Sequence, residues 1–189
     1  MEGIFSIIMG IGSARYYSED KKMLDSNKPI ERILQNARFK KVIPYLKGDV
    51  MDFGGNKGEL RKFVKGNYLV VNYDHSVMKG KTFDTIVALA IIEHIVFNEV
   101  FDIFRKFKQE HLKENGVIFL TTPTKISRPV LDLMRLTGIG RGDSDEHKHY
   151  WNKREIYDLA KKSGFIVEKY QKFQLGLNQM AIFKNGGTL

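Results

Sequence analysis

An acidic residue and several glycines lie close together in one short stretch of the chain. Asp52 stands two residues before Gly54, and Gly55, Asn56 and Gly58 complete the stretch. Glycine has no Cβ, so the backbone can turn sharply here and approach a ligand closely. The spacing matches neither the phosphate-binding loop nor the dinucleotide fingerprint, and the Asp52 carboxylate would repel a pyrophosphate. The stretch therefore favours a ligand with an ammonium or hydroxyl group, although an ordinary strand-to-helix turn also uses glycine.

A second carboxylate, Asp74, follows the next apolar run of the sequence, 22 residues after Asp52. At the end of a strand, such a carboxylate can accept hydrogen bonds from both hydroxyls of a ribose. The alternative is a capping or turn role, because His75 and Ser76 come directly after it. Together, the two carboxylates indicate a ligand that has a ribose and a positively charged group. S-adenosylmethionine has both.

Histidines and a further carboxylate could serve proton transfer or metal binding. Glu93 and His94 follow an apolar run, and His94 is the candidate general base because an imidazole titrates near neutral pH. The alternative for His94 is a scaffold role in which it orients Glu93. His147 and His149 lie among carboxylates in a polar stretch, but two histidines two residues apart in a loop are a weak metal-binding pattern. We therefore expect no metal site.

The composition is that of a globular chain of 189 residues, about the size of one domain. Hydrophobic residues make up 42% and charged residues 28%, which excludes a disordered or fibrous protein. The absence of cysteine excludes disulfides, thiolate metal ligands and a cysteine nucleophile. A net charge of +9 favours anionic partners such as nucleic acid, a phospholipid surface or an acidic small substrate.

The start of the chain predicts neither a membrane-spanning segment nor a signal peptide. Its longest apolar run covers residues 4–9, far fewer than the roughly 20 residues that cross a bilayer. Glu2 and the lack of Lys or Arg before that run are atypical of a signal peptide. We expect a cytoplasmic protein without contact to a membrane surface.

Short apolar runs alternate with amphipathic segments, which is typical of a doubly wound α/β sheet. Helices are predicted over residues 27–47, 59–64, 92–110 and 153–162. Strands are predicted over residues 50–53, 68–73, 82–90, 116–121, 165–170 and 179–183. A loop is predicted over residues 123–151. Ligands of such sheets bind beyond the carboxyl ends of the strands, where Asp52, Asp74 and Glu93 stand.

Taken in order, these motifs resemble the class I S-adenosylmethionine-dependent methyltransferases, within the broad small-molecule group of ubiquinone-biosynthesis and methyltransferase type 11 or 23 domains. The resemblance extends over about residues 38–183 and depends on the order and spacing of its segments. The matching segments are 50–58 (VMDFGGNKG), 71–74 (VNYD), 83–95 (FDTIVALAIIEHI), 115–123 (NGVIFLTTP) and 163–167 (SGFIV).

The resemblance implies a three-layer αβα Rossmann-like fold whose sheet is mostly parallel with an antiparallel last strand. The stretch from Asp74 to Phe83 is too short for the usual helix and third strand, so we expect that strand to be reduced or missing. We expect a single domain over residues 1–189. Its N-terminal helical segment, 1–48, would either form a lid on the acceptor pocket or pack on the core as ordinary structure, and its Rossmann-like core would span 49–189.

The resemblance also implies that the cofactor is S-adenosylmethionine. Asp74 would hold the ribose, and Glu93 would lie near the methyl-transfer side of the pocket. The methionine part would be surrounded by Asp52, Gly54, Gly55, Asn56 and Gly58. Two features depart from the family pattern. Asn56 stands where the family usually has a second glycine, and the acidic residue that normally contacts adenine after the third strand is missing.

For the reaction, the resemblance implies methyl transfer to a small-molecule acceptor. His94 and His147 are the candidate catalytic residues, because His147 matches a histidine that can border the acceptor pocket. A nucleic-acid methyltransferase is one alternative, suggested by the net charge, but the sequence has no Asn/Asp-Pro-Pro-aromatic motif. A non-catalytic member of the fold that binds the cofactor or a partner is another. The sequence identifies neither the acceptor nor the oligomeric state.

Overall fold

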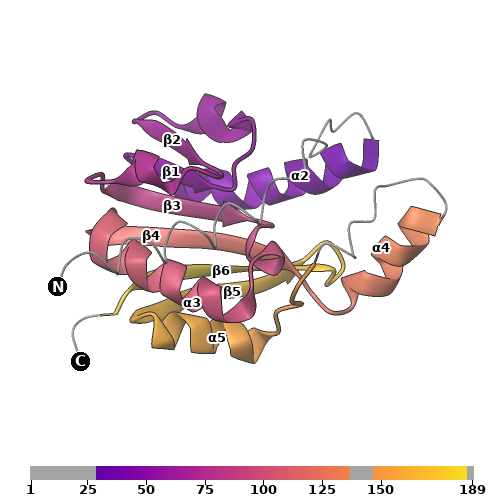
Figure 1. The fold of residues 1–189 in the computed structure, drawn as a ribbon. Coiled ribbons are helices and arrows are strands. Elements are labelled where there is room, and N and C mark those ends of the chain that lie inside the picture. Colours follow the sequence, from indigo (N-terminus) through magenta and orange to yellow (C-terminus); the bar gives the residue numbers. More distant parts are fainter. Residues whose placement is uncertain (1–28, 137–146, 187–189) are drawn as a thin grey trace.

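The computed structural model describes residues 29–136 and 147–186. These residues form a six-stranded sheet with the strand order β2-β1-β3-β4-β6-β5 (Figure 1). Its strands are β1 (Val50–Phe53), β2 (Tyr68–Val71), β3 (Phe83–Leu89), β4 (Leu112–Pro123), β5 (Phe165–Phe173) and β6 (Asn178–Asn185). Strands β1 to β4 pair in parallel, whereas β6 pairs antiparallel with β4 and with β5. This confirms the predicted mostly parallel sheet with an antiparallel last strand.

The third strand expected of the family is missing from the sheet. Between β2 and β3 the chain forms only the 3-10 turn η3 (His75–Met78). The stretch after Asp74 is too short to cross back over the sheet and add a strand. Its length had predicted this absence. Strand β2 therefore forms one edge of the sheet.

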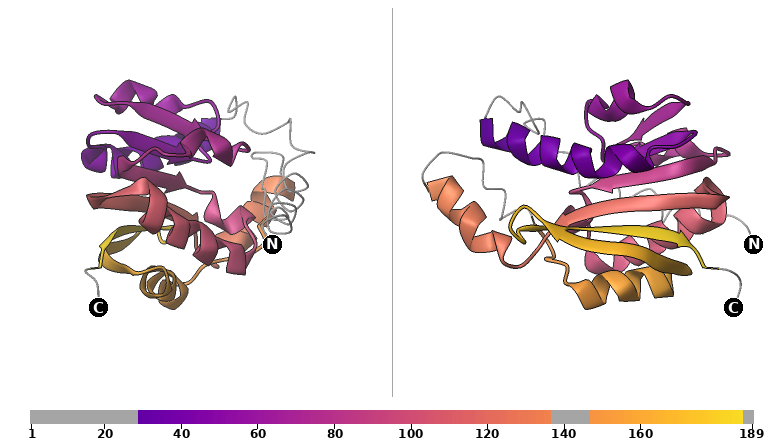
Figure 2. Two further views of the ribbon diagram at one scale, coloured as in Figure 1. Left: turned by 60° about the vertical axis from the view of Figure 1, so that its left-hand side comes forward. Right: turned by 180° about the vertical axis from the view of Figure 1, so that it is seen from behind.

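Helices cover both faces of the sheet. Helix α2 (Pro29–Val42) lies on one face, and α3 (Phe97–Lys106) and α5 (Lys153–Lys162) lie on the other (Figure 2). Helix α4 (Ser127–Leu136) extends beyond the end of β4 (Figure 1). The arrangement confirms the predicted three-layer αβα fold. Among the described helices, none combines the length and apolar character that a membrane crossing requires.

The apolar side chains of each strand alternate between the two faces, as the period of a strand requires. Met51 and Phe53 belong to the core under α3 and α5, while Val50 belongs to the smaller core under α2. By this alternation Asp52 shares the face of Val50. The strand that carries the candidate ligand-binding turn is thus fixed from both sides.

Three short elements between the strands differ from the sequence-based expectations. The predicted helix over 59–64 is the 3-10 turn η2 (Glu59–Phe63). The predicted helix over 92–110 is divided into the 3-10 turn η4 (Ile92–His94), α3 and the π-helical segment η5 (Phe107–His111). Val96 has an extended backbone with ψ of 132° and separates η4 from α3.

The predicted loop over 123–151 is wrong in part, because it contains α4. Pro129 is the third residue of α4, where a proline disrupts no intrahelical hydrogen bond. Of the expected N-terminal segment over 1–48, only α2 and the 3-10 turn η1 (Ile43–Tyr45) are described. The apolar residues 4–9 lie outside the described residues.

Candidate functional site

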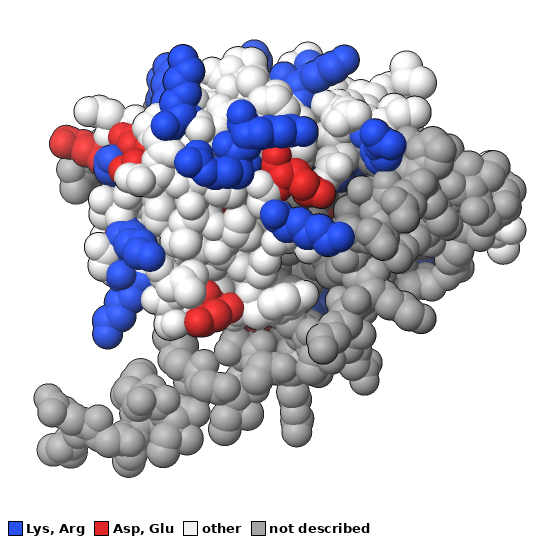
Figure 3. Space-filling model, turned by 90° about the horizontal axis from the view of Figure 1, so that it is seen from above, with Lys and Arg blue, Asp and Glu red and all other residues white. Residues whose placement is uncertain are grey.

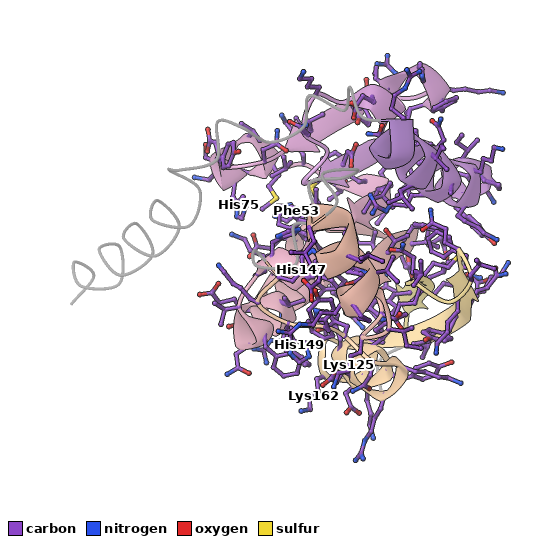
Figure 4. All side chains as sticks on the ribbon, turned by 90° about the vertical axis from the view of Figure 1, so that its right-hand side faces the viewer. Phe53, His75, Lys125, His147, His149 and Lys162 are labelled. Atoms are coloured by element: carbon purple, nitrogen blue, oxygen red, sulfur yellow. The ribbon has the colours of Figure 1, made fainter. Side chains whose placement is uncertain are left out.

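The carboxyl ends of β1, β2 and β3 meet at one edge of the sheet. The strand order changes direction at β1, because β2 pairs with one side of β1 and β3 with the other. In open α/β sheets, this switch point leaves a crevice in which ligands bind. Figure 4 views this edge and places Phe53, His75 and His147 on it.

The turn that follows β1 begins with a glycine in the left-handed region. Gly54 has φ of 78°, and its amide donates a hydrogen bond to the Val71 carbonyl at 2.8 Å. A Cβ at residue 54 would lie 2.6 Å from Cγ1 of Ile91. Any side chain here would be strained both by φ and by this contact. The turn is therefore held between the ends of β2 and β3.

Asn56 takes a backbone conformation that favours glycine. Its φ is 48°, a region that asparagine enters more readily than most residues. Asn72 braces it twice, because Asn72 Oδ1 accepts from the Asn56 amide and Asn72 Nδ2 donates to the Asn56 carbonyl, both at 3.0 Å. The side-chain Nδ2 of Asn56 is buried without a hydrogen-bond partner in the described part of the chain. It is a donor available to a ligand.

Asp52 is buried beneath this turn, with 3% of its surface exposed. The Tyr68 hydroxyl donates a hydrogen bond to Asp52 Oδ2, and Gly55 leaves the space that the carboxylate occupies. Burial raises the pKa of Asp52 from 3.8 to about 6. Tyr68 was not among the predicted site residues. Parallel pairing of Val50 with Tyr68 brings its side chain to Asp52, but the sequence does not show that register.

Asp74 lies at the same edge but on the surface. Its Oδ1 accepts a hydrogen bond from the Ser76 amide at 2.9 Å, which caps η3. Hydrogen bonding from the Ser76 side chain, and then from its amide, lowers the pKa of Asp74. The capping alternative is thus present in the structure. The ring of the next residue, His75, packs against Phe53 with centroids 5.4 Å apart (Figure 4). The exposed carboxylate therefore belongs to a turn that is packed against the end of β1.

Glu93 lies in η4 at the end of β3, with 1% of its surface exposed. Its Oε2 has no hydrogen-bond partner among the described residues. Burial raises the pKa of Glu93 above its usual range. The Glu93 carbonyl accepts hydrogen bonds from the amides of Lys148 and His149, at 2.8 and 3.3 Å. These bonds attach the segment that precedes α5 to the end of β3.

This attachment brings His147 to His94. Their ring centroids lie 4.9 Å apart at an interplanar angle of 71°. Burial, followed by the charges of His94 and Arg38, lowers the pKa of His147 to about 4. His149 instead lies with its Nε2 3.1 Å from Glu155 Oε2 and its ring against Phe97. The structure therefore places His147 with His94 rather than with His149.

Glu93, His94 and His147 together form a group of potential metal ligands. One ligand atom from each lies within 4.8 Å of the others. Arg38 of α2 faces this group, since its charge acts on Glu93 and on His147. Its Nε is buried without a hydrogen-bond partner in the described residues. The sequence carries a signal for Arg38, because it stands between Leu34 and Val42 at intervals of four, on the apolar face of α2.

Comparison with solved structures shows that the fold is shared. A SAM-dependent methyltransferase from Archaeoglobus fulgidus aligns with TM-score 0.61 at 18% identity, over 82% of this chain and 94% of that one. Magnesium protoporphyrin IX methyltransferase from Synechocystis PCC 6803, with bound SAH, aligns with TM-score 0.57 at 13% identity, over 82% and 85%. The PH0226 protein from Pyrococcus horikoshii OT3 aligns with TM-score 0.57 at 14% identity, over 80% and 92%.

The sequence comparisons identify the family. A search of curated proteins finds no match to this chain. Residues 25–170 match the model of Methyltransf_23, described as a methyltransferase domain, over most of the chain. The resemblance to class I methyltransferases is thereby confirmed, while the ubiquinone-biosynthesis subgroup stays a prediction. The chain belongs to the Methyltransf_23 family of methyltransferase domains.

Proposed function

We propose that this protein transfers a methyl group from S-adenosylmethionine to a small-molecule acceptor. The observation that carries the proposal is the turn after β1, which combines the left-handed Gly54 and Asn56 with a buried unpartnered amide donor at the switch point of the sheet. Membership of a methyltransferase family supports the reaction class. A structure of the same fold with bound SAH supports the cofactor.

The residues at the edge of the sheet suit the parts of this cofactor. Asn56 Nδ2, which lacks a partner in the described residues, suits the methionine carboxylate. The exposed Asp74 carboxylate suits the ribose hydroxyls, because only one of its oxygens is needed for the bond to Ser76. Asp52 supports the turn from below, since its carboxylate is engaged by Tyr68. The described sheet lacks the family's third strand, after which the acidic residue that contacts adenine would stand.

The cofactor would supply an electrophilic methyl group, so the protein contributes mainly position and a shielded pocket. Correct in-line placement of an acceptor atom contributes about 7–11 kcal/mol toward the barrier. A base is required only where the acceptor atom carries a proton that must leave. His147 is neutral at pH 7 because its pKa is lowered to about 4, which makes it a weak base. His94 is the better candidate for proton transfer.

Calorimetry with S-adenosylmethionine and S-adenosylhomocysteine tests the cofactor site. Asp74→Ala should weaken binding about 10- to 100-fold, because a hydrogen bond to a charged acceptor contributes about 1.5–3 kcal/mol. Asp158→Ala is the matched control, since it removes an exposed carboxylate of α5 that faces Arg154. Unchanged binding in Asp74→Ala removes Asp74 from the site, and no binding by the wild type overturns the proposed function.

A nucleic-acid acceptor is the second candidate. Figure 3 shows Lys and Arg side chains over the face near the β2 edge, with a few acidic side chains between them, and the exposed basic residues of this region are Lys57, Arg61, Lys62 and Lys65. RNA binding that weakens steeply with salt would favour this acceptor class. Turnover of cofactor labelled in its methyl group separates both candidates from a non-catalytic binding protein.

A further inference from the structure

One carboxylate and two imidazoles converge at the carboxyl edge of the sheet from segments more than 50 residues apart in the sequence. Glu93 and His94 belong to η4, and His147 precedes α5. One ligand atom of each lies within 4.8 Å of the others. We propose that these three residues bind a divalent transition-metal ion whose remaining coordination positions accept an oxygen of the acceptor. This departs from our expectation that the protein has no metal site.

Hydrogen bonds hold the segment that carries His147 against the end of β3. The Lys148 amide donates to the Glu93 carbonyl at 2.8 Å, next to the ligand group itself. The indole Nε1 of Trp151 donates to the Ile92 carbonyl at 3.3 Å, and the Trp151 side chain is fully buried. Backbone hydrogen bonds and a buried anchor therefore preorganise the three ligands.

Two atoms of this group are buried without partners. Glu93 Oε2 and His147 Nδ1 have no hydrogen-bond partner in the described residues. A buried polar atom that stays unsatisfied costs about 1–3 kcal/mol, and more where it is charged. A cation bound between the two side chains would satisfy the carboxylate oxygen and an imidazole nitrogen at once. The ligand geometry and the missing partners thus indicate the same occupant.

The nearby cation, Arg38, does not replace a metal ion in this role. Arg38 acts on Glu93 through its charge, but no hydrogen bond or ion pair joins the two within the described ranges, and Arg38 Nε is itself unpartnered. One carboxylate, one dication and one guanidinium would leave the bound site with a positive charge. Such a site favours an anionic oxygen as the next ligand.

Two imidazole nitrogens and one carboxylate oxygen favour Zn²⁺, Co²⁺ or Mn²⁺ over Mg²⁺ and Ca²⁺, which prefer all-oxygen ligands. Metal bonds of about 2.1 Å at tetrahedral angles place ligand atoms about 3.4 Å apart. The side chains must therefore move closer by about 1.4 Å at most, starting from 4.8 Å. Three protein ligands leave at least one position open, as in catalytic rather than structural sites.

The role of that open position rests on the proposed function, with one change: His94, as a metal ligand, no longer serves as the base, and the metal ion takes over that role. An acceptor hydroxyl oxygen bound to the dication loses its proton to solvent more easily, because the metal stabilises the oxyanion. The oxygen then forms a bond to the methyl carbon while the carbon–sulfur bond breaks. The products are a methyl ether, S-adenosylhomocysteine and one released proton, with no oxidation or reduction.

Metal binding is tested on the full chain after treatment with a chelator. Calorimetry with Zn²⁺ and visible absorption with Co²⁺ should show one equivalent bound. Glu93→Gln and His147→Gln should each weaken binding by at least about 100-fold, because even residues behind the ligands contribute about 10- to 100-fold. His149→Gln is the matched control, since His149 lies in the same segment but against Glu155, and it should bind as the wild type does.

Three results would overturn the metal site. These are no stoichiometric binding of Zn²⁺ or Co²⁺ by the wild type, unchanged binding in Glu93→Gln and His147→Gln, or a loss in His149→Gln equal to that in His147→Gln. His94→Gln replaces Glu93→Gln if circular dichroism shows that the latter does not fold. Calorimetry of the metal-free protein with S-adenosylmethionine keeps the tests separate, because it addresses the proposed function alone.

Discussion

At the scale of residues, the candidate site contains a carboxylate that is buried and an asparagine whose backbone has a positive φ. Asp52 is a carboxylate buried under a turn, where Tyr68 alone of the described side chains donates to it. Asn56 occupies a backbone region that suits glycine and is held there by Asn72. Both arrangements cost free energy that the rest of the fold must offset, which is common at ligand-binding sites.

Asp52→Asn tests the burial of this carboxylate through the pH dependence of stability. Because the pKa of folded Asp52 is raised from 3.8 to about 6, its contribution to stability is complete below about pH 4 and is lost as pH rises through 6. Relative to the wild type, the free energy of unfolding of Asp52→Asn should therefore increase by on the order of 3 kcal/mol between pH 4 and pH 8. Urea unfolding at a series of pH values measures it. A difference that is independent of pH would contradict the burial.

Substitutions at Asn56 test the left-handed turn. Asn56→Gly should keep the free energy of unfolding within about 1 kcal/mol of the wild type, because glycine adopts this φ without strain. Asn56→Val should lose about 1–2 kcal/mol or more, since a β-branched side chain is strained there. Thermal unfolding of both variants provides the comparison. Equal stability of the two variants would show that residue 56 is not in the left-handed region.

The site residues that could be predicted are those whose type and spacing carry the signal. The glycines after β1 and the carboxylate Asp74 belong to one continuous pattern, so their common edge followed from parallel strands. Tyr68 could not be found in this way, because cross-strand register decides which side chain reaches a carboxylate. The spacing of Arg38 places it on the apolar face of α2, but only the docking of that helix brings its charge to Glu93. The contact of His147 with His94, instead of with its sequence neighbour His149, likewise depends on the tertiary structure. It is set by the backbone hydrogen bonds that residues 148 and 149 donate to the Glu93 carbonyl.

At the scale of elements, the segment before α5 links the site to the core. Helix α5 begins with a capping box, in which the Asn152 side chain accepts from the Glu155 amide and the Glu155 side chain accepts from the Asn152 amide. Trp151 packs against Phe97 and Phe101 of α3. The start of α5 therefore fixes the segment that presents His147.

Asn152→Ala tests how much this cap contributes. The loss of its side-chain acceptor should lower the free energy of unfolding by about 1 kcal/mol, since the Glu155 amide then lacks a partner. Asn36→Ala, which removes an exposed asparagine from α2, should cause no comparable loss. Urea unfolding of the two variants decides the matter. If Asn152→Ala is as stable as Asn36→Ala, the cap does not hold the helix start.

The main strands could be predicted because continuous apolar runs identify buried parallel strands. The helices were less predictable. The break at Val96 interrupts an unbroken amphipathic pattern over 92–110, and periodicity does not show such a break. Helix α4 lies within the predicted loop over 123–151, and its Pro129 stands in the first turn, where proline is tolerated.

At the scale of the molecule, the missing third strand leaves β2 at the edge of the sheet. The spacing after Asp74 predicted this loss, and the antiparallel last strand followed from the family resemblance rather than from the pattern of residues. An edge strand exposes half of its backbone groups. The proposed cofactor site therefore lies beside an edge strand.

Hydrogen exchange tests this arrangement. Amides of β1, β3, β4 and β6 should exchange slowest, because each of these strands pairs on both sides. Amides of β2 that face away from β1 should exchange at the rate of open backbone. Strong protection of those β2 amides would show that another segment covers the edge.

The central claim is that the turn after β1 and the end of β2 bind the methyl donor. An NMR titration of the labelled chain with S-adenosylhomocysteine tests it most directly. The account predicts the largest chemical-shift changes at the amides of residues 54–58 and of Asp74. Amides at the amino ends of the strands, such as those at the start of β4, should change little. Saturable binding that leaves residues 54–58 and Asp74 unshifted would contradict it.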